Sequence, residues 1–377
     1  MNLHDFDNMR PFEPEELPEV YDRLLQDEQF RKVLAFAMPG MDVETIGLLM
    51  HRCLTNLDFQ KVFCYSFLDD VLQKQADSCT IDLSAVDTQQ RYTFVSNHRD
   101  IVLDSAILSK LIIDNGFSTT CEVAIGDNLL TIPWVKDLAR INKTFIVERS
   151  LQPREMFVAS QRMSEYMHYV IGEKHDNIWI AQREGRAKDS NDLTQPAILK
   201  MMAMGGEGTD VDRLIQLHIA PVAISYEYDP CDYLKAREMQ LRRDDAHWQK
   251  APGDDVESMR TGIMGSKGNI HFHVAPCIDD WLDKHCRNLK KTELFETVAR
   301  HIDQEIHSRY RLYPINHYAY QSLNNQDVET AHCEDYFKGQ LEKIDLPNRD
   351  EDFLRECLLK MYANPLINKM KQTSDAR

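Results

Sequence analysis

Short apolar runs alternate with helix-length segments from residue 91 onward, and this alternation constrains the fold more than any other feature of the chain. The runs are YTFVS, CEVAIG, TFIVER, NIWIAQ, HIAPVAISY and NIHFHVA. Strands separated by helices need crossover connections, which produce a largely parallel sheet. Several runs are apolar at nearly every position, as in strands covered on both faces. The sequence therefore predicts an α/β fold with a mostly parallel, mixed sheet flanked by helices.

Helical segments are expected on both sides of this α/β region. Before it, apolar residues recur with the spacing of one helix face, at Val20, Leu24, Leu25, Phe30, Val33 and Leu34. Helical periodicity returns after residue 279. We therefore predict an N-terminal helical region over residues 1–88, an α/β core over 89–278 and a C-terminal helical region over 279–377.

Charge and composition exclude several classes of protein. The chain has 61 acidic against 44 basic residues and a net charge of −17, which repels nucleic acid. No segment reaches the ~18 apolar residues of a membrane span, and no signal peptide is recognisable. The nine cysteines lack C-x-x-C spacing, which is typical of reduced thiols. We expect a cytoplasmic protein that contacts the inner membrane face at most peripherally.

His98 is the first candidate catalytic residue. It follows the apolar run TFVS and precedes a helical pattern, so it lies beyond the carboxyl end of a strand, where open α/β sheets bind ligands. Imidazole, with a pKa of about 6.5, can accept a hydroxyl proton at neutral pH. Asp104 or Asp100 would complete a dyad by orienting the ring. In the alternative interpretation, Asp100 only caps the helix and Asp104 lies on a solvated face.

A basic, glycine-containing turn follows the run NIWIA. It contains Glu184, Gly185 and Arg186, and a guanidinium group matches the geometry of phosphate oxygens. Lys143 and Arg149 flank the run TFIVE in a locally basic stretch, which favours binding of a small anion. The alternative for the turn is an ordinary solvated loop.

Metal and nucleotide sites are not expected. His271 and His273 would share one face of a strand, but no third ligand is suitably spaced. The glycines at 205, 206 and 208 do not match a phosphate-binding loop.

Residues 90–230 resemble the phospholipid and glycerol acyltransferase superfamily, which includes glycerol-3-phosphate and lysophosphatidate acyltransferases. The family's four motifs are matched in order by His98 with Asp104, by Gly126 to Arg149, by the turn at 184–186 and by Pro221. The runs SNHRDIVLDS, IGDNLL and IAQREGRAKD are also similar to a subgroup of long acyltransferases from Bacteroidota.

Two spacings depart from the family pattern. Five residues rather than four separate His98 from Asp104, so both Asp104 and Asp100 remain candidates for the dyad acid. Asp104 is preferred because apolar helix residues follow it, as in the family. Arg186 also stands one position nearer to Glu184 than usual.

The resemblance implies an acyltransferase core over residues 89–278, in which His98 activates a hydroxyl of glycerol 3-phosphate or lysophosphatidate. The hydroxyl would attack the thioester of an acyl carrier protein or of coenzyme A, with no cofactor or metal. Arg149 and Arg186, with Lys143, would hold the acceptor phosphate, and Glu184 would brace an arginine. The alternatives are O-acylation of a lyso-aminolipid such as a glycine or ornithine lipid, thioester hydrolysis, or a non-catalytic interaction protein.

Overall fold

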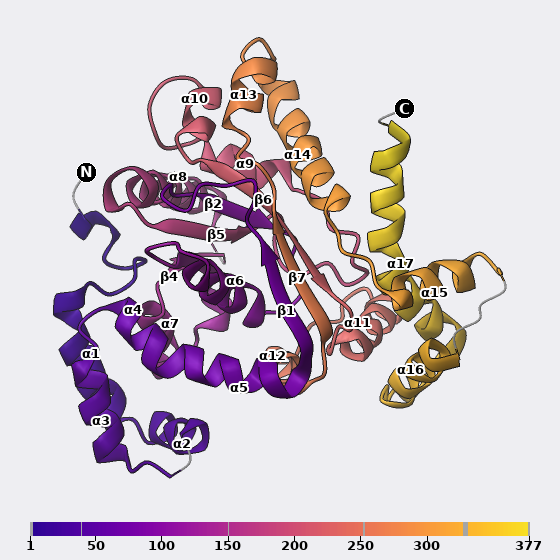
Figure 1. Ribbon diagram of the computed structural model, residues 1–377, viewed down its shortest axis with the longest axis horizontal. Coiled ribbons are helices and arrows are strands. Elements are labelled where there is room, and N and C mark those ends of the chain that lie inside the picture. Colours follow the sequence, from indigo (N-terminus) through magenta and orange to yellow (C-terminus); the bar gives the residue numbers. More distant parts are fainter. Residues whose placement is uncertain (1–2, 39, 150, 252, 327–330, 376–377) are drawn as a thin grey trace.

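The computed structural model describes residues 3–38, 40–149, 151–251, 253–326 and 331–375, and their centre is a seven-stranded sheet (Figure 1). The strand order is β1-β7-β6-β2-β5-β3-β4. The only antiparallel pair among these described strands is β6 with β7; the others are parallel. The predicted α/β fold with a mostly parallel, mixed sheet is confirmed. The strands are β1 Ala76–Asp82, β2 Thr93–Ser96, β3 Cys121–Gly126, β4 Thr144–Val147, β5 Asn177–Ala181, β6 Ile219–Tyr226 and β7 Gly268–Val274.

Helices cover both faces of the sheet. Successive side chains of each strand point to opposite faces, so the apolar strands present apolar side chains on both. In β2, Phe94 packs with apolar residues of α5 (Ser66–Gln75) and α6 (Leu103–Asp114) on one face. Its neighbour Val95 belongs to the cluster on the other face, with α8 (Pro153–Tyr169), α9 (Pro196–Met202), α13 (Asp279–Cys286) and α14 (Lys291–Ser308). Both side chains are fully buried. Two-sided burial explains why the central strands are apolar throughout.

β1 lies within residues 1–88, where the sequence analysis expected helix. It pairs only with β7, in parallel, and is an edge strand. Its residues are at most partly buried, so it lacks the continuous apolar run of the central strands. An edge strand of this kind gives a weak sequence signal.

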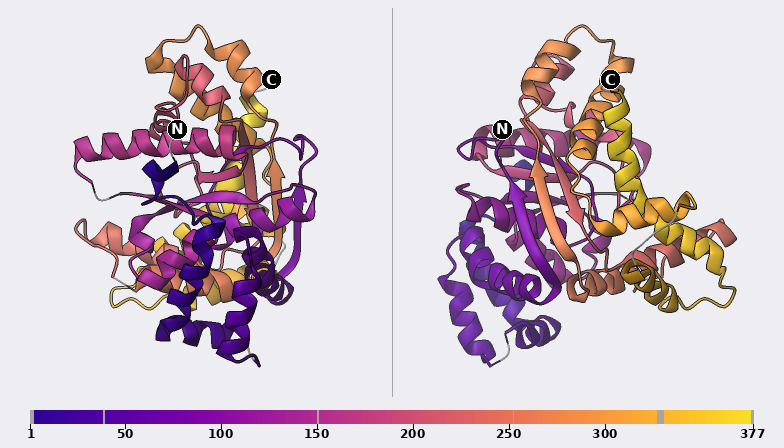
Figure 2. Two further views of the ribbon diagram at one scale, coloured as in Figure 1. Left: turned by 90° about the vertical axis from the view of Figure 1, so that its left-hand side faces the viewer. Right: turned by 45° about the vertical axis from the view of Figure 1, so that its right-hand side comes forward.

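The N-terminal helices form a separate small core beside α7 (Pro133–Ile141). Residues of α1 (Leu17–Gln26), α2 (Glu28–Ala37) and α3 (Val43–Arg52) pack there with buried Ile141 and with Leu138 and Trp134. This small core lies at the opposite end of the molecule from the C-terminal helices (Figure 2). None of the helices in the described ranges is long and apolar enough to cross a membrane.

The C-terminal helices pack around α17 (Glu351–Asp375). Their core includes residues of α15 (Pro314–Leu323), α16 (Ala331–Glu342) and α11 (Asp232–Asp244). From α17, Asn364 Nδ2 donates to the Asp189 carbonyl and Asn368 Nδ2 donates to Asn191 Oδ1. From α14, Asp303 accepts from Thr194, and His307 Nε2 lies 2.9 Å from the Asp192 carbonyl oxygen. These contacts hold the loop that follows β5.

Candidate active site

His98 lies just past the carboxyl end of β2 and contacts a buried carboxylate. His98 Nδ1 is 2.8 Å from Asp104 Oδ2; the His98 side chain is 14% exposed and that of Asp104 is fully buried. A carboxylate only accepts hydrogen bonds, so Nδ1 carries a hydrogen, and in the neutral ring the lone pair is on Nε2. Nε2 has no partner among the described residues. The ring therefore presents a free basic nitrogen at the sheet edge.

Asp104 is fixed in place by the start of α6. Its Oδ2 also accepts from the backbone N–H groups of Arg99 at 2.6 Å and Asp100 at 3.0 Å. The indole ring of Trp179 packs edge-on against His98, with ring centroids 5.4 Å apart. The positions of both side chains are thus fixed by their neighbours.

Asp100 has a different role. Its Oδ1 accepts from the N–H groups of Val102 at 2.9 Å and Leu103 at 2.8 Å, so it caps the first turn of α6. A Cβ atom at Gly262 would overlap its other carboxylate oxygen, so α12 (Asp254–Met264) closes over it. The contact with His98 belongs to Asp104, whose burial also contradicts the alternative of a solvated face.

Arg149 and Glu184 meet at the same edge of the sheet. Arg149 Nη1 lies 3.9 Å from Glu184 Oε1, a loose ion pair in which the Glu184 side chain is 70% exposed. Gly126 ends β3 beneath this arginine, since a Cβ atom there would lie 2.5 Å from Arg149 Nε and from Asn128 Oδ1. Because Gly126 has no side chain, the Arg149 guanidinium group can lie across the end of β3.

Arg186 lies next to the dyad loop, the loop between β2 and α6 that contains His98 and Asp100. Its guanidinium group has unused hydrogen-bonding capacity. Its Nη1 is buried and has no hydrogen-bond partner among the described residues. Burial raises the pKa of Asp100, the charge of Asp104 adds to the rise, and the positive charge of Arg186 opposes it. Gly185, with a φ of 67°, provides the left-handed turn that precedes Arg186. An unpaired buried guanidinium nitrogen is costly unless a ligand accepts from it.

Lys143 does not fit the phosphate-binding role expected from the sequence. It precedes β4, and its Nζ donates to Asp176 at 2.7 Å and Thr119 at 2.9 Å, which precede β5 and β3. In parallel strands, residues that precede the strands gather at the edge opposite those that follow them. Lys143 is therefore at the wrong edge of the sheet, in a buried ion pair.

Lys235 was missed by the sequence analysis. It is buried in α11, forms an ion pair with Asp229 and donates from Nζ to the Arg99 carbonyl at 3.2 Å. It thereby fixes the backbone beside His98 from 136 residues away in the chain. No local pattern reveals such a contact.

Residues 79–225 match the family model described as Acyltransferase. Over this stretch the chain is similar to the acyltransferase family. The acyltransferase segment runs from within β1 to within β6 and contains His98, Asp104, Arg149 and the turn at 184–186. No curated protein matches the chain. A similar solved structure is the crystal structure of the 1-acyl-sn-glycerophosphate (LPA) acyltransferase, PlsC, from Thermotoga maritima, at 11% identity and a TM-score of 0.35, covering 77% of this chain and 95% of that one.

Proposed function

We propose that this acyltransferase moves a fatty acyl group from a thioester to a hydroxyl of glycerol 3-phosphate or lysophosphatidate. The observation that carries the proposal is the contact of His98 Nδ1 with buried Asp104 inside the acyltransferase segment. The contact leaves a basic nitrogen available at the sheet edge where ligands of α/β proteins bind.

In the proposed reaction, His98 Nε2 takes the proton of the acceptor hydroxyl as the oxygen attacks the thioester carbonyl. The tetrahedral intermediate then collapses, the carbon–sulfur bond breaks, and the departing thiolate takes up the proton from His98. Asp104 orients the ring and stabilises the transient imidazolium through Nδ1. General-base help of this kind contributes roughly 10²- to 10⁴-fold, and orientation of the acceptor supplies more.

We assign the acceptor phosphate to Arg186, with Arg149 as a second contact. Arg186 Nη1 is buried without a protein partner, and its charge acts on Asp100 in the dyad loop. Arg149 is only loosely paired with Glu184, so a phosphate can replace or join that carboxylate. A guanidinium group binds phosphate oxygens through two parallel N–H donors.

The donor thioester is proposed to be that of an acyl carrier protein or coenzyme A, with no cofactor.

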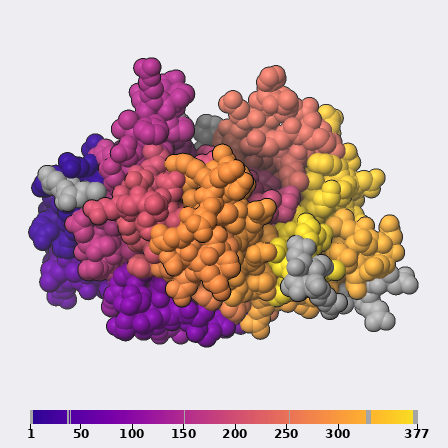
Figure 3. Space-filling view, turned by 90° about the horizontal axis from the view of Figure 1, so that it is seen from above, coloured from indigo at the N-terminus to yellow at the C-terminus, as the bar shows by residue number. Residues whose placement is uncertain are grey.

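A lipid surface is the proposed source or destination of the acyl chains. Met156, Phe157 and Val158 are exposed in the first turns of α8, next to exposed Arg154 and shortly after Arg149. Figure 3 shows this magenta segment standing out from the surface, across a hollow from the salmon segment of α11 and α12.

The test is thiol release together with product analysis, using purified full-length protein, acyl-coenzyme A or acyl carrier protein, and a panel of acceptors. We expect ester product with glycerol 3-phosphate or lysophosphatidate and its loss in His98→Ala. His51→Ala, at an exposed histidine in α3, is the control. Full activity in His98→Ala would refute the mechanism. Product only with a lyso-aminolipid, or equal thiol release without any acceptor, would favour O-acylation of aminolipids or hydrolysis instead.

A further inference from the structure

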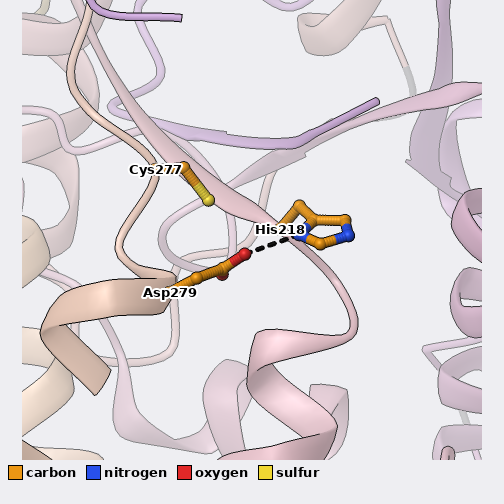
Figure 4. Close-up of side chains that lie close together, drawn as sticks. All are labelled: His218, Cys277 and Asp279. Carbon is orange, nitrogen blue, oxygen red and sulfur yellow. Dashed lines mark hydrogen bonds and ion pairs between the residues drawn. The ribbon is translucent and has the colours of Figure 1, made fainter. Parts of the chain in front are cut away.

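His218, Cys277 and Asp279 come together at the sheet edge opposite the dyad (Figure 4). His218 directly precedes β6, whereas Cys277 and Asp279 follow β7. Because β6 and β7 are antiparallel, the start of one lies beside the end of the other. β2 runs parallel to β6 and ends at His98, so the cluster is separated from His98 by the length of the strands.

The three side chains offer one nitrogen, one sulfur and one oxygen atom within 4.8 Å of one another. His218 Nδ1 is 2.5 Å from Asp279 Oδ2. Imidazole, thiolate and carboxylate are the three ligand types that zinc takes in proteins, with bonds of about 2.0–2.3 Å. The His218 and Cys277 side chains are both part-exposed.

The backbone around the cluster is held firmly. Ile278 N donates to the Ile219 carbonyl at 3.0 Å, and Thr93 N donates to the carbonyls of Leu217 and His218. Ile278, between the two ligands, is buried in the core. The ligands are therefore presented by a fixed frame, as in preorganised metal sites.

Asp279 supplies a second, independent observation. Its Oδ2 faces His218, but its Oδ1 is buried and has no hydrogen-bond partner among the described residues. A buried carboxylate oxygen without a donor is unfavourable, and a bound cation satisfies it.

We propose that His218, Cys277 and Asp279 bind a zinc-like divalent cation, with solvent in the remaining position. On binding, the Cys277 thiol loses its proton to solvent and the thiolate bonds to the metal. The cation would tie the start of β6 to the connection between β7 and α13, remote from acyl transfer. Histidine, cysteine and carboxylate together favour zinc or cobalt over magnesium or calcium.

The test uses cobalt(II) as a spectroscopic probe of the full-length protein, after treatment with a chelator. We expect one equivalent to produce a thiolate-to-cobalt charge-transfer band, which zinc then removes by displacement. Cys277→Ser should abolish the band and Asp279→Asn should weaken it. Cys79→Ser is the matched control, because Cys79 is also part-buried beside the same core cluster and is not in the metal cluster.

Absence of the band in the unmutated protein, or an equal band in Cys277→Ser, would overturn the proposal and leave His218 with Asp279 as a plain ion pair. Loss of the band in Cys79→Ser would assign the metal to other thiols, which also overturns the proposal. The titration needs no turnover, so its result is independent of whether the proposed acyl transfer is correct. Thermal unfolding with and without zinc provides a second measurement, with a higher Tm expected only when Cys277 and Asp279 are both intact.

Discussion

Arg99 and Asp192 form a buried ion pair in which 2.9 Å separate Arg99 Nη1 from Asp192 Oδ2. Arg99 follows His98 in the chain, and Asp192 lies in the loop that follows the turn at 184–186. Both side chains are at most 7% exposed. The pair therefore joins the loop of the proposed base to the loop of the proposed phosphate contacts.

Asp192→Asn is expected to destabilise the protein by about 3 kcal/mol, because it leaves the Arg99 charge buried without its partner. Urea unfolding measures the loss in free energy of unfolding. Asp70→Asn is the control, since its ion pair with Lys74 is exposed and a change within about 0.5 kcal/mol is expected. Equal stability of Asp192→Asn and the unmutated protein would contradict the importance of the buried pair.

Asp104→Asn should lower kcat by about 10²- to 10⁴-fold, because the amide no longer stabilises the imidazolium that forms on His98. Asp100→Asn should mainly reduce stability, since Asp100 caps α6 and does not contact the ring. Steady-state kinetics and urea unfolding of both variants separate the two roles. A larger loss of kcat in Asp100→Asn than in Asp104→Asn would reverse the assignment.

Arg186→Ala should raise the KM for the phosphate-bearing acceptor by about ten- to a hundredfold, as expected for loss of a charge-assisted hydrogen bond. Arg186→Lys should recover only part of the affinity, because an ammonium group cannot bind phosphate through a planar fork. Arg300→Ala, at an exposed arginine of α14, is the control. An unchanged acceptor KM in Arg186→Ala would remove this residue from phosphate binding.

Burial lowers the pKa of His301 to about 4, where its ring stacks on Trp281 with centroids 3.7 Å apart. The unfolded chain, with a histidine pKa of about 6.5, binds more protons between these two values, so stability falls as pH falls from 6.5 to 4. The upper limit is about 3 kcal/mol, and solvent screening of the half-buried ring reduces it.

His301→Gln should lack this component of the pH dependence. Urea unfolding at several pH values compares the two proteins. The same decline in both would show that other groups cause it.

Replacing Phe157 and Val158 together with serine should reduce binding to anionic phospholipid vesicles, because each buries apolar surface at the membrane interface in the proposed contact. Their exposures are 62% and 64%. Leu48→Ser in α3, where Leu48 is 62% exposed, is the matched control. Vesicle flotation measures the bound fraction. Equal flotation of the double variant and the unmutated protein would remove α8 from the lipid contact.

Local sequence patterns predicted the structural features that depend on residues close together in the chain. The strands β2 to β7 coincide with the short apolar runs of the sequence, and His98 meets Asp104 within one loop and helix turn. The sequence could also have placed Lys143 at the edge opposite His98. Lys143 precedes a parallel strand, and such a residue lies at the opposite edge from one that follows a strand.

Contacts between distant segments could not be predicted in this way. Arg99 with Asp192 and His218 with Asp279 depend on strand order, and His218 meets Asp279 only because β7 runs antiparallel to β6. The parallel pairing of β7 with β1 places His271 and His273 beside Thr80 and Asp82. The histidine pair most visible in the sequence is therefore not in the metal-ligand cluster of the described residues.

Asn364 and Asn368 of α17 hold the loop at 189–191 from the far end of the chain. A protein shortened before α17 would retain the whole acyltransferase segment but would lack these two hydrogen bonds. We expect the loop that carries Arg186 to be held less firmly relative to His98 in such a protein. Stability of the catalytic half thus depends on a helix that the family match does not include. Recombining this core with the tails of another protein would require new hydrogen-bond donors for the Asp189 carbonyl and for Asn191 Oδ1.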